Sequence, residues 1–291
     1  MEVPVIVNVT SGHGRYREAL PAVRRELSPF SLSIFTTSSP GEATQVMERI
    51  AGEGHQTVVV VGGDGTVNSL LESAIAFDVC LVPFQAGTGS DLVRSFHWRA
   101  GRSVAEMIRD EEFRRIDVCE ARYLEGTRLF VNIMEVGFGA RVVSRVNRSG
   151  GGHGRLPPFE IAVLGGELPG LRAYELDLLY GEQVAHYRAI EVILANGRYF
   201  GGGGMLSAPY ADLTDGLVDV HVIGGEMGGR ISLLARFRHL VDGSYVRMPG
   251  IASMRAERIE IKGKAPTEVD GENSLEAPVT VAVRRQALRV I

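Results

Sequence analysis

Short apolar runs alternate with longer amphipathic segments over the first hundred residues. The run at 58–61 is four consecutive valines. Because a strand covered on both faces reads as continuous apolar sequence, this run predicts a fully buried strand. Strands that alternate with helices are typical of a parallel sheet in an α/β domain. We expect strands at 3–9, 32–36, 58–61 and 79–83, and helices at 16–27, 43–51 and 67–76.

From about residue 117 the pattern changes to apolar strand runs without regular helices between them. Such a succession predicts a largely antiparallel, β-sandwich-like domain. The expected fold class is therefore α/β plus all-β, with a parallel-sheet domain at 1–116 and a β-rich domain at 117–291, whose extreme C-terminus can pack back on the first domain. The expected strands of the second domain are 117–123, 128–136, 171–180, 184–194, 217–223, 258–262 and 280–283.

Composition narrows the classes of function. With 291 residues, 45% of them hydrophobic and 23% charged, the chain is long enough for two globular domains. A net charge of −4 argues against a nucleic-acid binder, because no basic excess is present to neutralise backbone phosphates. Cys80 and Cys119 lie in apolar contexts typical of buried free thiols. No apolar run is long enough to span a bilayer, so we expect a cytoplasmic protein with peripheral membrane contact.

The loop that follows the valine run carries the strongest chemical signal. Gly62, Gly63 and Gly65 allow a ligand to approach bare backbone, and Asp64 or Thr66 can cap the helix that follows. A strand, a tight turn and a helix N-terminus together form an anion site made of amide N–H groups. The glycines alone suffice for the turn, so a carboxylate beside phosphate-binding amides indicates that a cation binds there too. An ordinary glycine turn of an α/β protein is the alternative.

Three further polar loops follow strands of the same expected sheet. Residues 8–15 form a glycine-bearing turn before a helix and are a second candidate phosphate cradle. Thr37 precedes the helix at 43–51, and the segment 84–94 follows the strand at 79–83. Because the carboxyl ends of parallel strands meet at one edge of a sheet, we expect all four loops to lie together.

The motif Gly-Gly-Asp-Gly-Thr at 62–66 resembles the nucleotide-binding signature shared by diacylglycerol-kinase-like lipid kinases, NAD kinases and phosphofructokinases. Two more loops narrow this resemblance to the diacylglycerol kinase family. The loop at 8–15 is similar to the family's NPxSGxG element followed by a basic residue, with Val9 in place of proline. Residues 37–43 are similar to its TxxxGxA element, in which the threonine contacts nucleotide.

The segment 87–94 is similar to the GTxND-F-A-R element of the same family, with Ser90 for asparagine and Leu92 for phenylalanine. Ser90 retains a short hydrogen-bonding side chain. The resemblance implies a nucleotide-binding domain of the NAD kinase/phosphofructokinase-like type. It implies that ATP is bound by Asn8, Ser11, Gly12, Gly14, Arg15, Thr37, Gly62, Gly63, Asp64, Gly65, Thr66, Asn68, Thr88 and Asp91.

In the second half of the chain, residues 196–219 are similar to the family's glycine-rich turn and AP…DG loop. In that family the aspartate of the DG pair, here Asp215, helps to bind a structural magnesium ion together with backbone carbonyls at the positions of Asp212 and Leu217. Oxygen ligands of this kind suit a hard cation. A plain Asp-Gly hairpin turn is the alternative. Asp219 is either a further ligand or lies on the solvent side of its strand.

The segment 265–272 matches the closing DGE element of the family. The resemblance implies that Glu272 is the catalytic base and that Asp270 supports it. In an extended segment the two carboxylates would face the same side, whereas a turn at Gly271 would separate them.

One other segment adds to the resemblance, and two have no function assigned from the sequence. Residues 130–140 are similar to the family's strand that ends in an NxxxxGxGA turn. Residues 227–241 predict a basic amphipathic helix, which either packs on the domain core or rests on an anionic membrane surface. The glycine-rich segment 149–154 predicts a loop, to which composition assigns no phosphate role.

The motifs run in the family's order from Asn8 to Glu272, so the chain resembles a diacylglycerol kinase family lipid kinase over most of its length. The resemblance implies transfer of the γ-phosphoryl group of ATP, with Mg²⁺, to the hydroxyl of a lipid such as diacylglycerol at a membrane surface. Sphingoid bases, ceramide and glycolipids stay open as acceptors. The alternatives are an NAD kinase and a catalytically silent lipid- or nucleotide-binding regulator. No nucleic-acid partner is expected, and a homodimer is compatible with this interpretation.

Overall fold

The computed structural model describes the chain except for residues 86–89, 149–169, 202–204, 226–238 and 240. The chain divides into two compact units. The first contains Met1–Val118 and Arg285–Ile291, and the second contains Cys119–Gly201 and Met205–Arg284. The last residues of the chain thus belong to the first unit. Cys80 and Cys119 are buried free thiols, as expected.

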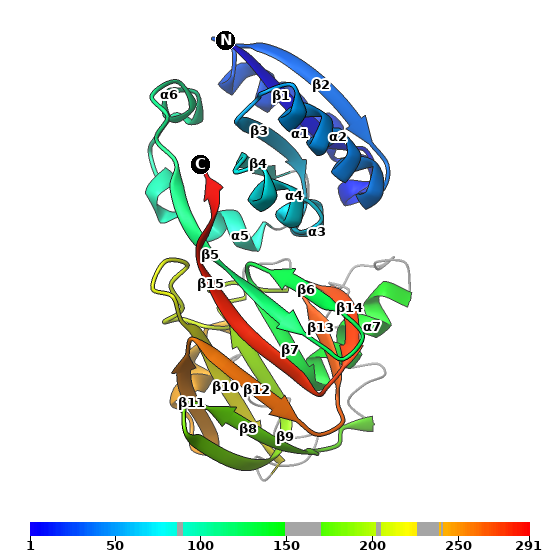
Figure 1. Ribbon diagram of the computed structural model, residues 1–291, viewed down its shortest axis with the longest axis vertical. Coiled ribbons are helices and arrows are strands. Elements are labelled where there is room, and N and C mark those ends of the chain that lie inside the picture. Colours follow the sequence, from blue (N-terminus) through cyan, green and yellow to red (C-terminus); the bar gives the residue numbers. More distant parts are fainter. Residues whose placement is uncertain (86–89, 149–169, 202–204, 226–238, 240) are drawn as a thin grey trace. The chain divides into compact units, whose positions relative to one another are not determined.

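The first unit is built on a parallel sheet (Figure 1). Its strands follow the order β4 (Cys80–Gln85), β3 (Thr57–Gly62), β1 (Glu2–Asn8) and β2 (Ser31–Thr37). The end of β15 (Val279–Val290) joins β4 in parallel at Val290 and Leu81. The helices of this unit are α1 (Tyr16–Glu26), α2 (Pro40–Gly52), α3 (Asp64–Asn68), α4 (Leu71–Ala76), α5 (Asp91–Arg94) and α6 (Val104–Arg109), with 3₁₀ turns η1 (Ser11–Gly14) and η2 (His97–Arg99).

Burial explains why the valine run forms a strand. All four valines of β3 are fully buried, which confirms the expectation of a strand covered on both faces. Local signals also fix α2, where Ser39 caps the helix by accepting a hydrogen bond from the Glu42 N–H, and Pro40 occupies its first turn. Side chains from both ends of the unit's sequence meet in one core, which includes Val5, Val59, Val82 and Ile291.

The prediction of a single helix at 67–76 is wrong, because two short helices, α3 and α4, lie in this part of the chain. Helix α3 begins at Asp64, with Gly63 in extended conformation as its N-cap. It ends at Asn68, where the Ser69 hydroxyl bonds back to the Thr66 carbonyl at 2.8 Å. Thr66 therefore does not cap a helix, and its side chain is available to other loops.

The second unit is an antiparallel assembly around the long strand β9 (Gln183–Ala195). Strand β9 pairs with β8 (Tyr174–Tyr180), β7 (Ile133–Gly137) and β10 (Val218–Gly224). The remaining strands are β6 (Thr127–Phe130), β11 (Ile251–Ala256), β12 (Arg258–Lys262), β13 (Pro266–Val269) and β14 (Glu272–Glu276), together with parts of β5 (Arg114–Arg122) and β15. One 3₁₀ turn, η6 (Ser244–Arg247), precedes β11.

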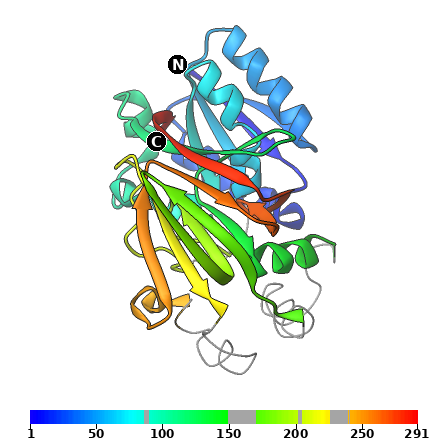
Figure 2. The ribbon, with the colours of Figure 1, turned by 60° about the horizontal axis from the view of Figure 1, so that its bottom comes forward.

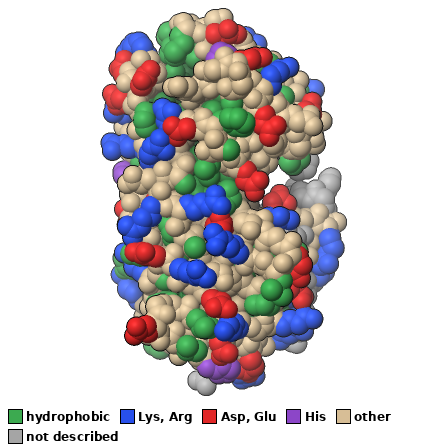
Figure 3. Space-filling model, viewed as in Figure 1, with side chains coloured by type: hydrophobic (Ala, Val, Ile, Leu, Met, Phe, Trp, Pro, Cys, Tyr) green, Lys and Arg blue, Asp and Glu red, His purple; other side chains and the backbone are tan. Residues whose placement is uncertain are grey.

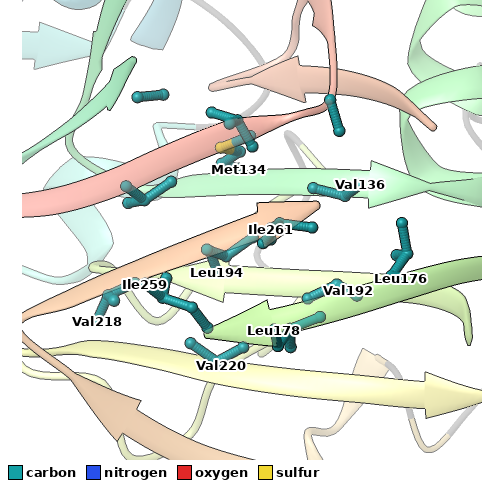
Figure 4. Close-up of a cluster of buried hydrophobic side chains, with 14 of the residues drawn as sticks. Met134, Val136, Leu176, Leu178, Val192, Leu194, Val218, Val220, Ile259 and Ile261 are labelled. Atoms are coloured by element: carbon teal, nitrogen blue, oxygen red, sulfur yellow. The ribbon is translucent and has the colours of Figure 1, made fainter. Parts of the chain in front are cut away.

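Two apolar faces hold the second unit together. Figure 4 shows one of them, where side chains from β7, β8, β9, β10 and β12 meet. The alternate residues of β7 and β9 point to the opposite face, where Ile133 and Ile193 join a second cluster. Helix α7 (Phe138–Arg148), the green helix in Figure 2, packs on β7, β13 and β14.

Several expectations for the second unit need correction. The strand expected at 128–136 is two strands, β6 and β7, with a break at Val131 and Asn132. Strands β11, β13 and β14 were not expected. The candidate helix at 227–241 and the glycine-rich segment at 149–154 lie largely or wholly outside the described residues. In the described part of the chain, no helix has both the length and the apolar character needed to cross a membrane.

Candidate active site

In the first unit, the loops after β1 and β3 are joined by a side-chain hydrogen bond. The Asn8 amide nitrogen donates to the Thr66 hydroxyl at 2.9 Å. The amide oxygen of Asn8 accepts from the backbone N–H of Thr10 at 3.0 Å and from its hydroxyl at 2.7 Å. Asn8 thus orders its own loop and fixes it to the 62–66 motif.

The glycines of the 62–66 motif allow the close approach of these loops. A Cβ at Gly62 would lie 2.5 Å from the Thr66 hydroxyl oxygen, a distance that real Cβ atoms do not show. A Cβ at Gly63 would lie 3.5 Å from the Ser11 hydroxyl oxygen, which places the two backbones in neighbouring positions. Gly62 is therefore required by packing, and Gly63 brings bare backbone beside the 3₁₀ turn η1.

Asp64 joins the same motif to the segment that follows β4. Its carboxylate accepts the backbone N–H of Asp91 at 2.9 Å and that of Leu92 at 3.3 Å, and the Ser90 hydroxyl lies 3.4 Å from one of its oxygens. Ser90, which stands where the family has asparagine, retains a hydrogen bond here. The expectation that glycines alone hold this turn is wrong, because the Asp64 side chain ties it to the start of α5.

The remaining nucleotide-binding candidates lie at the same carboxyl edge of the sheet or just beyond it. Thr37 ends β2 opposite Asn8, and its buried hydroxyl has no hydrogen-bond partner in the described part of the chain. Arg15 is exposed and directly precedes α1. Asn68 ends α3. Gly12 and Gly14 lie in the turn η1, and Thr88 falls outside the described residues.

In the second unit, the DGE element forms the turn of the β13–β14 hairpin. Val269 pairs with Glu272, and the two residues between them have left-handed backbone angles, with φ of 48° at Asp270 and 84° at Gly271. Two positive φ angles define a two-residue type I′ turn, for which Asp-Gly is a favoured sequence.

The Asp270 side chain anchors this turn to the link between β6 and β7. Its carboxylate accepts three backbone N–H groups, from Val131 at 2.9 Å, Asn132 at 3.0 Å and Ile133 at 2.9 Å. Its own N–H donates to the Ile133 carbonyl at 2.9 Å. These bonds explain why the expected strand at 128–136 is broken. They also favour an anchoring role for Asp270.

Two further contacts hold the middle of the turn. The Gly271 N–H donates to a Glu268 carboxylate oxygen at 2.7 Å, and the Gly271 carbonyl accepts from the Asn147 amide of α7 at 3.1 Å. Glu272 is exposed, and partial burial raises the pKa of its carboxyl above the usual value. The turn thus separates the two acidic groups: Asp270 binds backbone amides, and Glu272 faces solvent.

Three buried glutamates lie in or beside this hairpin, and none of them was predicted to be a site residue. Glu268 on β13 lies directly opposite Glu135 on β7, and Glu191 on β9 lies opposite Gly137. Glu191 accepts a hydrogen bond from the Gly139 N–H at the start of α7, and a Cβ at Gly139 would collide with the Glu135 carboxylate. A glutamate inside an apolar strand run is the sequence signal that would have revealed Glu135 and Glu191, whereas the polar segment around Glu268 offers no such signal.

Burial controls the ionisation of this glutamate cluster (Glu135, Glu191 and Glu268). Desolvation raises the pKa of Glu135 to about 8. Burial and then the charge of Glu135 raise the pKa values of Glu191 and Glu268 well above their usual range. Because several buried carboxylates cannot all be ionised side by side, the cluster retains protons near neutral pH.

The predicted metal ligands lie together in the loop before β10. The Asp212 carboxylate accepts the Thr214 N–H at 2.9 Å and hydroxyl at 2.8 Å, and the Asp215 carboxylate accepts the Leu217 N–H at 2.9 Å. Arg255 donates to the other Asp215 oxygen at 2.8 Å. No group of three or more His, Cys, Asp or Glu side chains among the described residues has the arrangement of a metal site. The magnesium site stays a prediction.

Comparison with known proteins identifies the family. The model of the diacylglycerol kinase catalytic domain matches residues 2–121, and that of the YegS C-terminal NAD kinase beta sandwich-like domain matches residues 132–291. The chain therefore belongs to the family of lipid kinases that combines these two domains. This membership confirms the resemblance and the fold class expected from the sequence.

Individual relatives agree with this placement. The chain is 27% identical to a diacylglycerol kinase of Mycobacterium tuberculosis, over 100% of this chain and 94% of the relative. It is also 27% identical to a probable lipid kinase YegS-like of Pseudomonas fluorescens, over 91% of this chain and 87% of the relative. A putative diacylglycerol kinase from Bacillus anthracis shares the fold, with a TM-score of 0.74 and 21% identity over 100% of this chain and 96% of that one.

Proposed function

We propose that the protein transfers the γ-phosphoryl group of ATP to the hydroxyl group of a lipid such as diacylglycerol. The observation that carries this proposal is the set of hydrogen bonds that joins three loops, from Asn8 to Thr66 and from the Asp91 N–H to Asp64. These bonds gather the 8–15, 62–66 and 90–92 segments at the carboxyl edge of one parallel sheet. Backbone amides gathered in this way suit a triphosphate.

Each unit supplies a different part of the chemistry in this proposal. In the first, the amides around Gly12 and Gly63 bind phosphate oxygens, with Arg15 adding positive charge. Mg²⁺ that accompanies ATP would supply charge neutralisation at the transferred phosphoryl group, and Asp64 directly follows Gly63 in the chain. Phosphoryl transfer needs mainly positioning and electrostatic stabilisation from a protein, which is what this arrangement offers.

In the second unit, Glu272 is the proposed general base. An alcohol is a poor nucleophile at neutral pH, so a carboxylate that accepts its proton contributes about 10²- to 10⁴-fold to the rate. The anchored Asp270 and the Glu268–Gly271 hydrogen bond fix the turn that carries Glu272. A raised pKa at Glu272 also makes it a stronger base than an ordinary glutamate.

The test is phosphorylation of a panel of acceptors with labelled ATP and Mg²⁺. Diacylglycerol, ceramide, a sphingoid base and a glycolipid are presented in mixed micelles, and NAD is presented in solution. We expect label in at least one lipid and none in NAD. Label in NAD alone would favour an NAD kinase, and nucleotide or lipid binding without turnover of any acceptor would favour the silent regulator. The Glu272→Gln variant serves as the control with the proposed base removed.

Cell location follows from the same proposal. A protein that takes its acceptor from a membrane works at the surface of that membrane, so we propose a cytoplasmic protein with peripheral attachment. Fractionation of cells with a salt wash of the membranes tests this, because a peripheral protein is released by salt and an integral one is not.

A further inference from the structure

Arg255 on β11 lies among the acidic side chains of the loop that carries the predicted metal ligands. Its Nη2 group donates to the Asp215 carboxylate at 2.8 Å and to the Tyr210 carbonyl at 3.2 Å. Its Nε and Nη2 groups both lie 3.2 Å from one oxygen of the Asp219 carboxylate. One guanidinium therefore contacts two carboxylates and a backbone carbonyl.

These contacts are of the kind that a hard divalent cation makes, and they share Asp215 with the predicted ligand set. Magnesium and calcium bind carboxylate and backbone carbonyl oxygens, and a guanidinium offers several N–H donors to the same kinds of oxygen. Both oxygens of Asp215 are already engaged, one by Arg255 and the other by the Leu217 N–H. A divalent ion bound to the Asp215 oxygen that Arg255 contacts would compete with the positively charged guanidinium for it.

The backbone fixes Arg255 in this position. Asp219 on β10 and Arg255 on β11 are directly paired residues of adjacent antiparallel strands. The Asp219 side chain is only 5% exposed. Because a buried carboxylate needs a positive partner, the register of β10 and β11 itself supplies the cation.

We propose that Arg255 takes the place of a structural divalent ion at this loop. In this chain the segment 210–219 is held by an internal guanidinium, so the folded second unit needs no metal there. The residues predicted as ligands by resemblance remain together, and a guanidinium from β11 offsets part of the negative charge around them. This proposal does not depend on the proposed phosphoryl transfer, because its test uses neither ATP nor lipid.

The wild-type protein gives the first measurement. Its melting temperature is recorded without nucleotide in EDTA, in magnesium and in calcium. We expect the same melting temperature in all three, because an ion that does not bind the folded state cannot stabilise it. A melting temperature that is higher in magnesium or calcium than in EDTA, with the difference absent in Asp215→Asn, would overturn the proposal. It would show that a metal binds at this loop.

The second measurement uses Arg255→Met, which removes the donors and keeps much of the side-chain length. In EDTA we expect its melting temperature to fall by about 5 °C or more, because Asp215 and the buried Asp219 lose their partner. Magnesium or calcium should restore part of that loss, since the freed oxygens can then bind an ion. Arg247→Met is the matched control, because Arg247 and Arg255 line one cavity of about 480 Å³. This variant should change neither the melting temperature in EDTA nor its response to magnesium or calcium.

Arg255→Lys keeps the test decisive if the methionine variant does not fold. A lysine retains the charge but not the forked donors. Arg255→Lys should therefore fold with a smaller loss of melting temperature than Arg255→Met, and magnesium should raise its melting temperature less. Arg255→Lys and Arg255→Met proteins that both melt like the wild type would show that the guanidinium does not hold the loop, and the proposal would fail.

Discussion

Glu272 is the exposed carboxylate of a turn whose other polar groups, on Asp270 and Gly271, are held by hydrogen bonds within the unit. Glu272→Gln keeps the size of the side chain and removes its basicity. We expect kcat to fall by about 10²- to 10⁴-fold with little change in the KM for ATP. Steady-state kinetics on the lipid acceptor measure both quantities. Glu276→Gln, on the same strand, is the control, and an unchanged kcat in Glu272→Gln would remove Glu272 as the base.

Asp64 has a structural contact as well as a proposed catalytic one. An asparagine retains one acceptor oxygen in place of two, so Asp64→Asn should lose part of the bond to the Asp91 and Leu92 amides, at a cost of about 1 kcal/mol. We also expect it to lose most activity, because the negative charge is gone. Ser90→Ala separates the two effects: it weakens the same junction without changing charge, and should remain active. Equal activity losses in both variants would point to the junction alone.

Glu135 predicts a dependence of stability on pH. Its pKa is raised from 4.5 to about 8 in the folded state, so the folded protein holds a proton that the unfolded chain releases at a lower pH. That contribution to stability is complete below the unfolded pKa and is lost as pH rises toward the folded one. Glutamine mimics the neutral acid, so Glu135→Gln should match wild type near pH 5 and exceed it near pH 8 by roughly 1–3 kcal/mol.

Urea unfolding of both proteins at the two pH values measures this difference. Glu276→Gln replaces an exposed glutamate of β14 and should show no such pH-dependent gain. Parallel stability curves for wild type and Glu135→Gln would mean that Glu135 is ionised in the folded protein.

At the level of single residues, the sequence predicts which motifs are present but not what their side chains bind. Asp270 lies in a motif, yet its three donors come from residues 137 to 139 positions earlier in the chain. Arg255 belongs to no motif, and its partners are on other elements. Such contacts depend on strand register, which one sequence does not specify.

Among the elements, those with a strong hydrophobic period were predicted best. The buried valine strand β3 and the helix α2 have local signals, whereas β11, β13 and β14 are short and carry polar or charged residues. The break between β6 and β7 has no local signal either, because amides there bond to Asp270 and not to a neighbouring strand. Tertiary contacts thus decided the boundaries that periodicity could not.

Helix α7 and strand β7 meet where Gly139 faces the Glu135 carboxylate. Gly139→Ala adds a Cβ that collides with that carboxylate, so we expect a loss of about 1–3 kcal/mol of stability. Glu135→Ala empties the space, and the double variant should therefore be more stable than the two single losses predict, by about 1 kcal/mol. Urea unfolding of the four proteins measures this coupling. Additive losses would show that the helix relieves the contact by moving.

Over the whole molecule, the change from alternating strands and helices to strands alone predicted two kinds of domain, and the family comparison agrees with that fold class. Each unit has its own apolar core. On the face drawn in Figure 3, cationic and anionic side chains occur among one another. This mixture fits the small net charge of −4.

The whole protein should respond to its acceptor as an enzyme that works at a surface. A lipid with apolar chains resides in micelles or membranes, so the rate should follow the mole fraction of diacylglycerol in detergent micelles and not its bulk concentration. Doubling detergent at constant diacylglycerol should therefore lower the rate, and doubling both together should leave it nearly unchanged. NAD, which is dissolved in water, would show no dependence on detergent. A rate that follows bulk concentration, together with phosphorylation of NAD, would contradict the lipid acceptor and favour the NAD kinase alternative.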